Sequence, residues 1–196
     1  MKILYGTTKT IRWLALITLV FVHDRIGAVE VTFAPKQPFP NCTAMRFADF
    51  NKDGHLDVLG YRNTLGVQQP FEFSLYLNKA SKPLGFDKST IISGSFGGGV
   101  LLETADFDRD GDTDFLAGWN IPGNGNKHTE WFKNDGLTSP TFSSHPIQTD
   151  PYPTGFAAIV DLDQDGWLDI VMNKGRLDVI QGWIDEGLCW FHNDGA

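Results

Sequence analysis

The stretch that decides the fold of this chain is ADFDRDGDTD, at residues 105–114. Two further versions keep the same order of residue types, ADFNKDGHLD at 48–57 and VDLDQDGWLD at 160–169. The first aspartates of these three loops lie 57 and then 55 residues apart along the chain. Self-similarity at a nearly constant spacing is typical of repeat proteins, in which every copy forms one structural unit. The sequence therefore predicts three such units.

Apolar runs surround the loops in the same order in each unit. One run precedes the loop, a second follows it, and further runs lead toward the next loop. The runs are rich in aromatic and β-branched residues and are bounded by Gly, Asn, Asp or Pro, which favours short strands over helices. The runs predicted as strands are 43–48, 56–60, 75–78, 85–92, 101–105, 114–118, 131–134, 141–147, 156–160, 168–172 and 190–193.

Short strands at this period predict four-stranded antiparallel sheets arranged as the blades of a β-propeller. The third unit has only three predicted strands, and the segment Glu30–Pro35 resembles the missing fourth. We therefore predict an all-β fold over residues 29–196, with three four-stranded blades and an N-terminal strand that completes the last one. Complete propellers have about four to eight blades. Three blades would be a fragment, half of an oligomeric ring, or an open arc, and exposed edges favour the first two because they invite association.

Each loop reads Asp-x-(Asp/Asn)-x-Asp-Gly-x-x-Asp, the pattern of a calcium site. Side-chain oxygens at alternate positions of a curled loop converge on one point, and Gly at the sixth position permits the sharp turn. The seventh position contributes its backbone carbonyl, so its side chain is free to vary. Hard oxygen ligands in a flexible loop favour Ca²⁺ over Zn²⁺ and Mg²⁺. We expect about three calcium ions, one per unit, held by Asp49, Asn51, Asp53, His55, Asp57, Asp106, Asp108, Asp110, Asp112, Asp114, Asp161, Asp163, Asp165, Trp167 and Asp169.

Two other interpretations of the loops are weaker. Asp, Asn and Gly also form solvated turns, but three copies with the same internal spacing are hard to explain in that way. An EF-hand requires a bidentate Glu at position twelve and flanking helices. This chain has Gly60, Ala117 and Met172 at that position, between strand-like flanks. We therefore predict that the ninth-position Asp closes each site.

With the segments Trp131–Gly136 and Trp190–Gly195 that follow them, the loops resemble FG-GAP/VCBS repeats, the blades of integrin α-subunit-like β-propellers. The resemblance covers nearly all of the chain after residue 28. It implies that the ion ties the first two strands of a blade together, so that calcium has a structural role. The first unit departs from the pattern, because Asn78 is followed by Lys79 and not by Asp-Gly.

The first 28 residues are predicted to be a secretory signal peptide. Lys2, Lys9 and Arg12 give a basic start, 13–22 is an apolar run too short to cross a bilayer comfortably, and Ile26–Ala28 offers a cleavage site. An uncleaved anchor is the alternative, and no later segment approaches transmembrane length. We expect the protein to be secreted, extracellular or at the cell surface, with the periplasm as a further option.

Export leaves two features open. Cys42 and Cys189 could form a disulfide or remain two separate buried thiols. The tripeptide Asn41-Cys42-Thr43 fits the N-glycosylation pattern, which matters only in a eukaryotic host.

The charge of the chain limits its partners. There are 16 Lys and Arg against 24 Asp and Glu, which gives a net charge of −8. A phosphate backbone would be repelled, so we predict no nucleic-acid partner. Much of the acid lies in the three loops, where bound divalent ions would neutralise it.

The sequence offers no clear catalytic constellation. The five histidines lack metal-ligand spacing, and no serine stands in a nucleophile elbow. Trp131 and Trp190 share a repeat position and are predicted to pack between blades. Trp119, Trp167 and Trp183 are predicted in or near loops, where they could stack on sugar rings or partners. The stretch 174–187 is the least repeat-like, so we would look for ligand contacts there first.

These observations favour a secreted calcium-binding repeat module that binds an extracellular protein or glycan in adhesion, with self-association able to complete a propeller. An enzyme is less favoured. The alternative is the propeller portion of a polysaccharide-active enzyme such as a lyase.

Overall fold

The computed structural model describes residues 39–63, 70–95, 98–120, 127–148, 156–178 and 182–195, and every regular element in these ranges is a β-strand. These strands belong to one compact unit, Pro40–Ala196. The predicted signal peptide and the strand predicted at Glu30–Pro35 lie outside the described residues.

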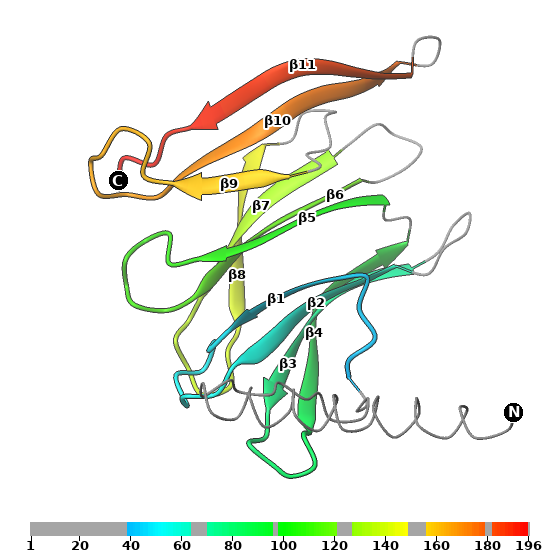
Figure 1. The fold of residues 1–196 in the computed structure, drawn as a ribbon, viewed down its shortest axis with the longest axis vertical. Helices are drawn as coiled ribbons and strands as arrows, with labels where there is room; N and C mark the ends of the chain where they lie inside the picture. The colour runs from blue at the N-terminus through cyan, green and yellow to red at the C-terminus, as the bar shows by residue number, and fades with distance from the viewer. Residues whose placement is uncertain are drawn as a thin grey trace, which may run out of the picture. The chain divides into compact units, whose positions relative to one another are not determined.

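The described strands form three antiparallel sheets (Figure 1). The first contains β1 (Ala44–Ala48), β2 (Asp57–Asn63), β3 (Pro70–Asn78) and β4 (Phe86–Ser95). The second contains β5 (Gly98–Ala105), β6 (Asp114–Asn120), β7 (Lys127–Asn134) and β8 (Phe142–Gln148). The third contains β9 (Ala157–Val160), β10 (Asp169–Asp178) and β11 (Gly182–Phe191). The all-β prediction is confirmed, as sheets of four, four and three strands.

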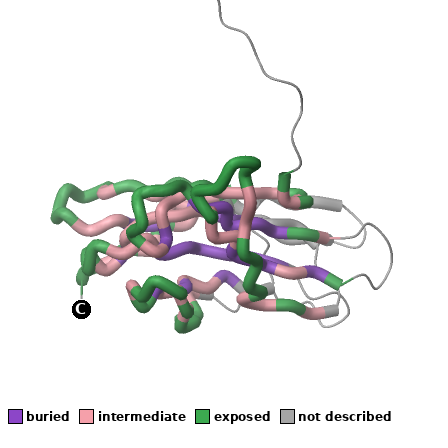
Figure 2. The backbone as a smooth tube through the Cα atoms, turned by 90° about the horizontal axis from the view of Figure 1, so that it is seen from below, coloured by how far each residue is buried: buried purple, intermediate pink, exposed green. Residues whose placement is uncertain are grey.

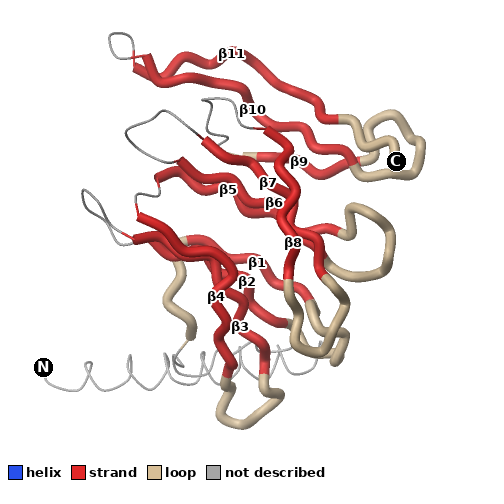
Figure 3. The backbone as a smooth tube through the Cα atoms, turned by 180° about the vertical axis from the view of Figure 1, so that it is seen from behind, coloured by secondary structure: helices blue, strands red, loops and turns tan. Residues whose placement is uncertain are grey.

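Each sheet is a meander, because strands that follow one another in the chain are hydrogen-bonded neighbours. The Asp-rich loops join the first two strands of each sheet, namely β1 to β2, β5 to β6 and β9 to β10. Figure 3 shows these three loops along the same side of the sheets. Strand β5 contacts β1 and β9, which places the second sheet between the other two.

The stretch 174–187, predicted to be irregular, is largely a long hairpin. Lys174 pairs with Gly187, and the pairing continues to Asp178 and Gly182 at the hairpin end. A register shift between Lys174 and Gly175 marks a bulge. A bulge interrupts the alternation of side chains along a strand, which is why the apolar pattern did not reveal this extension.

A first core lies between the first and second sheets. Its centre is aromatic: the rings of Phe115 and Phe132 stack at 4.5 Å between centroids, and Phe142 meets Phe115 edge-on at 5.0 Å. Trp119 belongs to this core and is 8% exposed, so the prediction that its ring is available for stacking on a sugar ring or a partner was wrong. The reason is that β6 extends to Asn120, and Trp119 continues the face formed by Phe115 and Ala117.

A second core lies between the second and third sheets. It contains Leu101 and Leu116, whose chain neighbours Leu102 and Phe115 belong to the first core. Successive side chains of a strand point to opposite faces, so the second sheet is covered on both sides. Figure 2 shows buried residues concentrated along the interior strands and exposed residues in the loops.

The two tryptophans at the shared repeat position have different surroundings. Trp131 packs against the second core, which confirms the predicted inter-sheet packing. Trp190 is 49% exposed. Cys42 and Cys189 are separate free thiols, as in the second of the two alternatives, but both are half-buried and not buried.

A side-chain amide joins the second sheet to the first, and an equivalent amide joins the third sheet to the second. Asn134 Nδ2 donates to the carbonyl of Phe50 at 2.9 Å and to that of Thr113 at 3.1 Å. Asn193 Nδ2 donates in the same way to Phe107 at 2.9 Å. Asn134 is fully buried, so these carbonyls would have no water to replace it.

Replacing Asn134 by Ala should lower the free energy of unfolding by about 1–3 kcal/mol, because a buried carbonyl loses its donor. The matched control is Asn78→Ala. Asn78 holds the same position in the first unit, but its amide donates to the carbonyl of Leu56, a residue that is 62% exposed. Urea denaturation measures both variants. Equal losses for the two would contradict the inter-sheet role of Asn134.

Candidate metal site

The three loops have the same hydrogen-bond pattern, starting at their first aspartate. The sixth-position Gly N–H donates to the first Asp Oδ2 at 2.8, 3.0 and 3.0 Å in loops one, two and three. The fifth-position N–H donates to the third-position Oδ1 at 3.2, 3.4 and 3.3 Å. The seventh-position N–H donates to the fifth-position Oδ1 at 2.9, 2.9 and 2.8 Å. In the second and third loops, one oxygen of each of these aspartates therefore shapes the turn, and its other oxygen lies outside these turn bonds. In the first loop, Asn51 has a single side-chain oxygen, which accepts from the N–H of Asp53, and Asp49 accepts with both of its oxygens.

Two left-handed residues make the curl of each loop. The sixth-position glycines Gly54, Gly111 and Gly166 have φ of 85°, 86° and 96°. The fourth-position residues Lys52, Arg109 and Gln164 have φ of 57°, 59° and 64°. The glycines were expected from the sequence. The fourth position was not, because a left-handed residue with a side chain leaves no compositional signal.

The ninth-position aspartates, Asp57, Asp114 and Asp169, are fully buried. In the second loop, Asp114 Oδ2 accepts from the N–H of Phe107 at 3.2 Å, and Oδ1 accepts from the N–H of Asn134 at 2.8 Å. The other two loops repeat both bonds, at 3.0 and 2.8 Å on Asp57 and at 3.1 and 2.9 Å on Asp169. Each carboxylate thus ties the start of its loop to the end of the third strand.

The cost of burying these carboxylates differs between units. Burial raises the pKa of Asp114 to about 6, despite hydrogen bonds from Asn134, Phe107 and the Trp131 indole, the last at 3.0 Å. Burial also raises the pKa of Asp57. In the third sheet, the N–H of Asn193 is the main cause that lowers the pKa of Asp169. A positive charge near Asp114 would offset the cost of ionising it.

Two buried carboxylate oxygens support the metal interpretation of the loops. Asp106 Oδ1 and Asp161 Oδ1, on the first residue of loops two and three, have no hydrogen-bond partner. Oxygens of Asp106, Asp108 and Asp114 also lie within 4.8 Å of one another. A buried carboxylate oxygen without a donor is costly, and a hard cation is the partner that such oxygens prefer. The residues of these loops therefore fit calcium.

A lysine and a histidine enter the loops, and neither was expected from the sequence. Lys133 Nζ contacts Asp108 and lies 3.1 Å from Asp110 Oδ2. The hydrogen bond to Asp108 is the main cause that raises the pKa of Lys133.

The third loop has an equivalent contact. His192 Nε2 lies 3.0 Å from Asp163 Oδ2 and 3.4 Å from Asp165 Oδ2. Lys133 and His192 both precede the inter-sheet Asn, and the first unit has Leu77 there. That shared position was the signal that could have identified them. A cation entering either loop competes with these side chains for the third- and fifth-position carboxylates.

Neighbouring loops also contact one another. Lys52 Nζ, from the fourth position of the first loop, lies 2.6 Å from Asp112 Oδ1, at the seventh position of the second. Arg109, at the fourth position of the second loop, lies over the ring of Trp167, at the seventh position of the third, 5.2 Å from its centroid. The seventh-position side chains therefore serve contacts between units.

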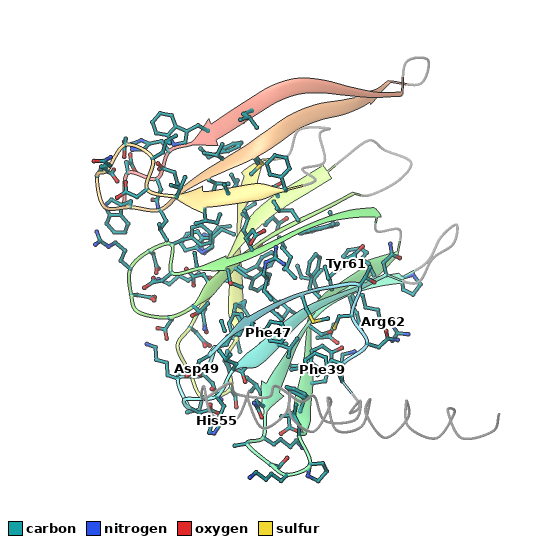
Figure 4. The ribbon with its side chains drawn as sticks, in the orientation of Figure 1. Phe39, Phe47, Asp49, His55, Tyr61 and Arg62 are labelled. Atoms are coloured by element: carbon teal, nitrogen blue, oxygen red, sulfur yellow. The ribbon has the colours of Figure 1, made fainter. Side chains whose placement is uncertain are left out.

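The first loop is closed by its own side chains. Asn51 Nδ2 donates to Asp53 Oδ2 at 3.0 Å, and His55 Nδ1 lies 3.2 Å from Asp53 Oδ1. Figure 4 shows Asp49 and His55 in this loop, at the opposite end of β2 from Tyr61 and Arg62. That His55, Asp112 and Trp167 supply backbone carbonyls to an ion stays a prediction.

A cavity of about 330 Å³ lies beside the second and third loops. Its apolar wall includes Trp131, Trp167 and Phe191, and its polar groups include Asp108 and His192. Of the tryptophans predicted near loops, Trp167 thus faces a cavity. Trp183 lies in β11, and its side chain is outside the described residues.

Comparison with known families gives a match. Residues 106–172 match the family model of an FG-GAP-like repeat. The matched range begins at the first Asp of the second loop and ends in β10, so it covers more than one period and includes both the second and the third loop. The match supports the FG-GAP part of the resemblance, and FG-GAP repeats occur mostly in extracellular or surface proteins. Comparison with curated proteins gave no match. Within the described residues, no helix is long and apolar enough to cross a membrane.

Replacing Asp114 by Asn should destabilise the repeat by about 2–3 kcal/mol even without calcium, because an amide NH₂ would face one of two backbone N–H donors. The control is Asp110→Asn, an exposed position in the same loop that accepts one of these turn bonds. Urea denaturation in EDTA measures both. A loss for Asp114→Asn no larger than that for Asp110→Asn would show that the ninth-position carboxylate is not a structural clamp.

Proposed function

We propose that this chain is an exported calcium-binding propeller-repeat module that binds an extracellular protein or glycan, with calcium in a structural role. The observation that carries the proposal is the pair of buried, unpartnered oxygens on Asp106 and Asp161, each in a loop of convergent acids. An FG-GAP-like repeat over 106–172 supports the propeller part.

Calcium would act in these loops by neutralising charge. The first, third, fifth and ninth positions would hold the ion, with the seventh-position carbonyl. Such an ion would coordinate the unpartnered oxygens of Asp106 and Asp161. In the second loop it would also lie near Asp114, whose raised pKa reflects the cost of its buried charge. Because the ninth-position Asp already bonds the loop to the third strand, calcium would stiffen a preformed connection.

Calcium should raise the melting temperature of the purified protein by about 5–10 °C at an ion concentration about a hundredfold above the dissociation constant, because the ion binds the folded state. EDTA should reverse the shift. Thermal unfolding followed by circular dichroism measures the effect, with Mg²⁺ at the same concentration as the control ion.

The matched variants are Asp106→Asn and Asp87→Asn. Asp106 belongs to the second loop, whereas Asp87 is an exposed acid of β4 paired with Lys79 at 2.5 Å. The first should reduce the calcium-dependent shift and the second should not. An unchanged melting curve in EDTA would refute the calcium proposal.

The ligand would be held beside the loops and not by the calcium ligands alone. The cavity lined by Trp131, Trp167 and Phe191 combines aromatic faces with the polar groups of Asp108, His192 and Asn193. Its volume is at the lower end of the range for ligand sites, about 300–1,000 Å³. Aromatic faces with adjacent polar groups suit a sugar ring or an aromatic side chain of a protein partner.

Retention on immobilised neutral and acidic polysaccharides tests the glycan form of this proposal. Trp167→Ala should weaken binding about tenfold, the size expected from one lost ring contact, without removing the calcium-dependent rise in melting temperature. Leu137→Ala, at a residue 59% exposed outside the cavity lining, is the control. If no polysaccharide is retained, or if Trp167→Ala binds as tightly as the parent, the cavity is not a glycan site.

A further inference from the structure

The outer face of the third sheet carries a continuous set of exposed apolar side chains. Ala157 and Ile159 pack against the second core, so the alternate residues of this segment point to the opposite face. The exposed members of that face, hereafter the β9–β11 face, are Phe156 (55%), Val160 (38%), Leu162 (50%), Leu188 (69%) and Trp190 (49%). Large exposed apolar patches of this kind mark interaction sites.

The same repeat positions are covered by the next sheet in the first two units. Leu162 corresponds to Phe50 and Phe107, which are 0% and 5% exposed. Leu188 corresponds to Phe73 at 0% and Thr129 at 4%. The β9–β11 face is therefore the third copy of an inter-sheet surface that is buried twice in this chain.

The hydrogen bond from an Asn side chain to a carbonyl of the preceding sheet also has no counterpart at this face among the described residues. The carbonyls of Phe50 and Phe107 each accept from an Asn of the following sheet. Among the described residues no side-chain amide reaches the corresponding carbonyl, that of Leu162. In the first unit, by contrast, Asn78 Nδ2 donates to Leu56 in its own unit, and no preceding carbonyl is paired with it in the described ranges.

In the described part of the chain, the contacts between neighbouring loops also leave one side chain without a counterpart at each end of the series. The fourth-position side chains of loops one and two reach the seventh-position side chains of the next loop. Continuing the series would bring Gln164, at the fourth position of the third loop, to a seventh-position residue beyond it. Among the described residues, His55, at the seventh position of the first loop, receives no such contact from a fourth-position side chain.

The outer face of the first sheet offers apolar surface for such a contact. Phe47, labelled in Figure 4, is 51% exposed, and Met45 and Tyr76 are half-buried. Met45 and Tyr76 hold the positions of Leu102 and Phe132, which in the second unit are buried against the sheet before them.

We propose that the β9–β11 face binds the first sheet of a second copy of this chain, head to tail. The contact continues the two inter-sheet interfaces already present: apolar face on apolar face, Asn78 of one copy donating to the Leu162 carbonyl of the other, and Gln164 beside His55. Two copies joined at both ends contain six sheets, within the range of about four to eight blades in closed propellers. This inference goes beyond the proposed function, since it depends on the sheet faces and not on calcium or a ligand.

Sedimentation equilibrium of the purified full chain at micromolar concentration tests the proposal. The parent should have the mass of two chains. Leu162→Glu combined with Leu188→Glu should lower that mass about two-fold, and Phe47→Glu should do the same from the opposite end. Leu137→Glu, at an exposed residue outside both faces, should leave the mass unchanged.

Mixing the two defective variants gives a second readout. Each keeps the face that the other lacks, so a one-to-one mixture should recover part of the two-chain mass. A single-chain mass for the parent would overturn the proposal. So would a two-chain mass for Phe47→Glu, which would indicate two β9–β11 faces packed on each other, or a two-chain mass for the double variant with circular dichroism like that of the parent.

Discussion

The buried carboxylate at the end of each Asp-rich loop is the contact on which the rest of the structure depends. Asp114 accepts one backbone N–H from the start of its loop and one from the end of β7. These two bonds fix the loop, the first strand pair and the third strand relative to one another. The N–H at the end of β7 belongs to Asn134, and the side chain of Asn134 donates to a carbonyl of the preceding sheet. The Asp114 carboxylate thus holds together its own sheet and also positions the residue that bonds this sheet to the one before it.

This arrangement places a negative charge where water cannot reach it, and the surroundings of the loop supply compensation. Lys133 brings positive charge to the third- and fifth-position acids of loop two, and Lys52 does so for Asp112 from the neighbouring loop. His192 lies against the corresponding acids of loop three and adds positive charge when it is protonated. The first loop has Leu77 at the position of Lys133 and has Asn51 in place of one acid. The first loop therefore has one acid fewer and, among the described residues, no lysine entering from the third strand. This indicates that the balance of acidic and basic side chains is set separately in each unit.

Sequence reasoning recovered what depends on local chemistry. The three units follow from the spacing of the loops, the strands from short runs of aromatic and β-branched residues, and the loop glycines from the sharp turn at the sixth position. The structure has all three. It failed where the outcome depends on a neighbouring unit. The ring of Trp119 was expected to be available to a ligand, but it is buried because residues of the first sheet pack on it. The hairpin at 174–187 was missed because a bulge hides its alternation. Lys133 and His192 were overlooked because they are distant in sequence from the loops they enter. Lys133, for example, is 25 residues from Asp108.

The inter-sheet bond of Asn134 and Asn193 has a consequence for how such a chain can change in length. The middle unit carries both an amide donor, Asn134, that reaches the unit before it and a carbonyl acceptor, that of Phe107, that is reached from the unit after it. A duplicated unit therefore brings both halves of the contact it needs, and a deleted unit leaves neighbours that still match. Arrays of this kind can grow or shrink by whole units without any coordinated second substitution, as expected where each unit interacts only with its nearest neighbours.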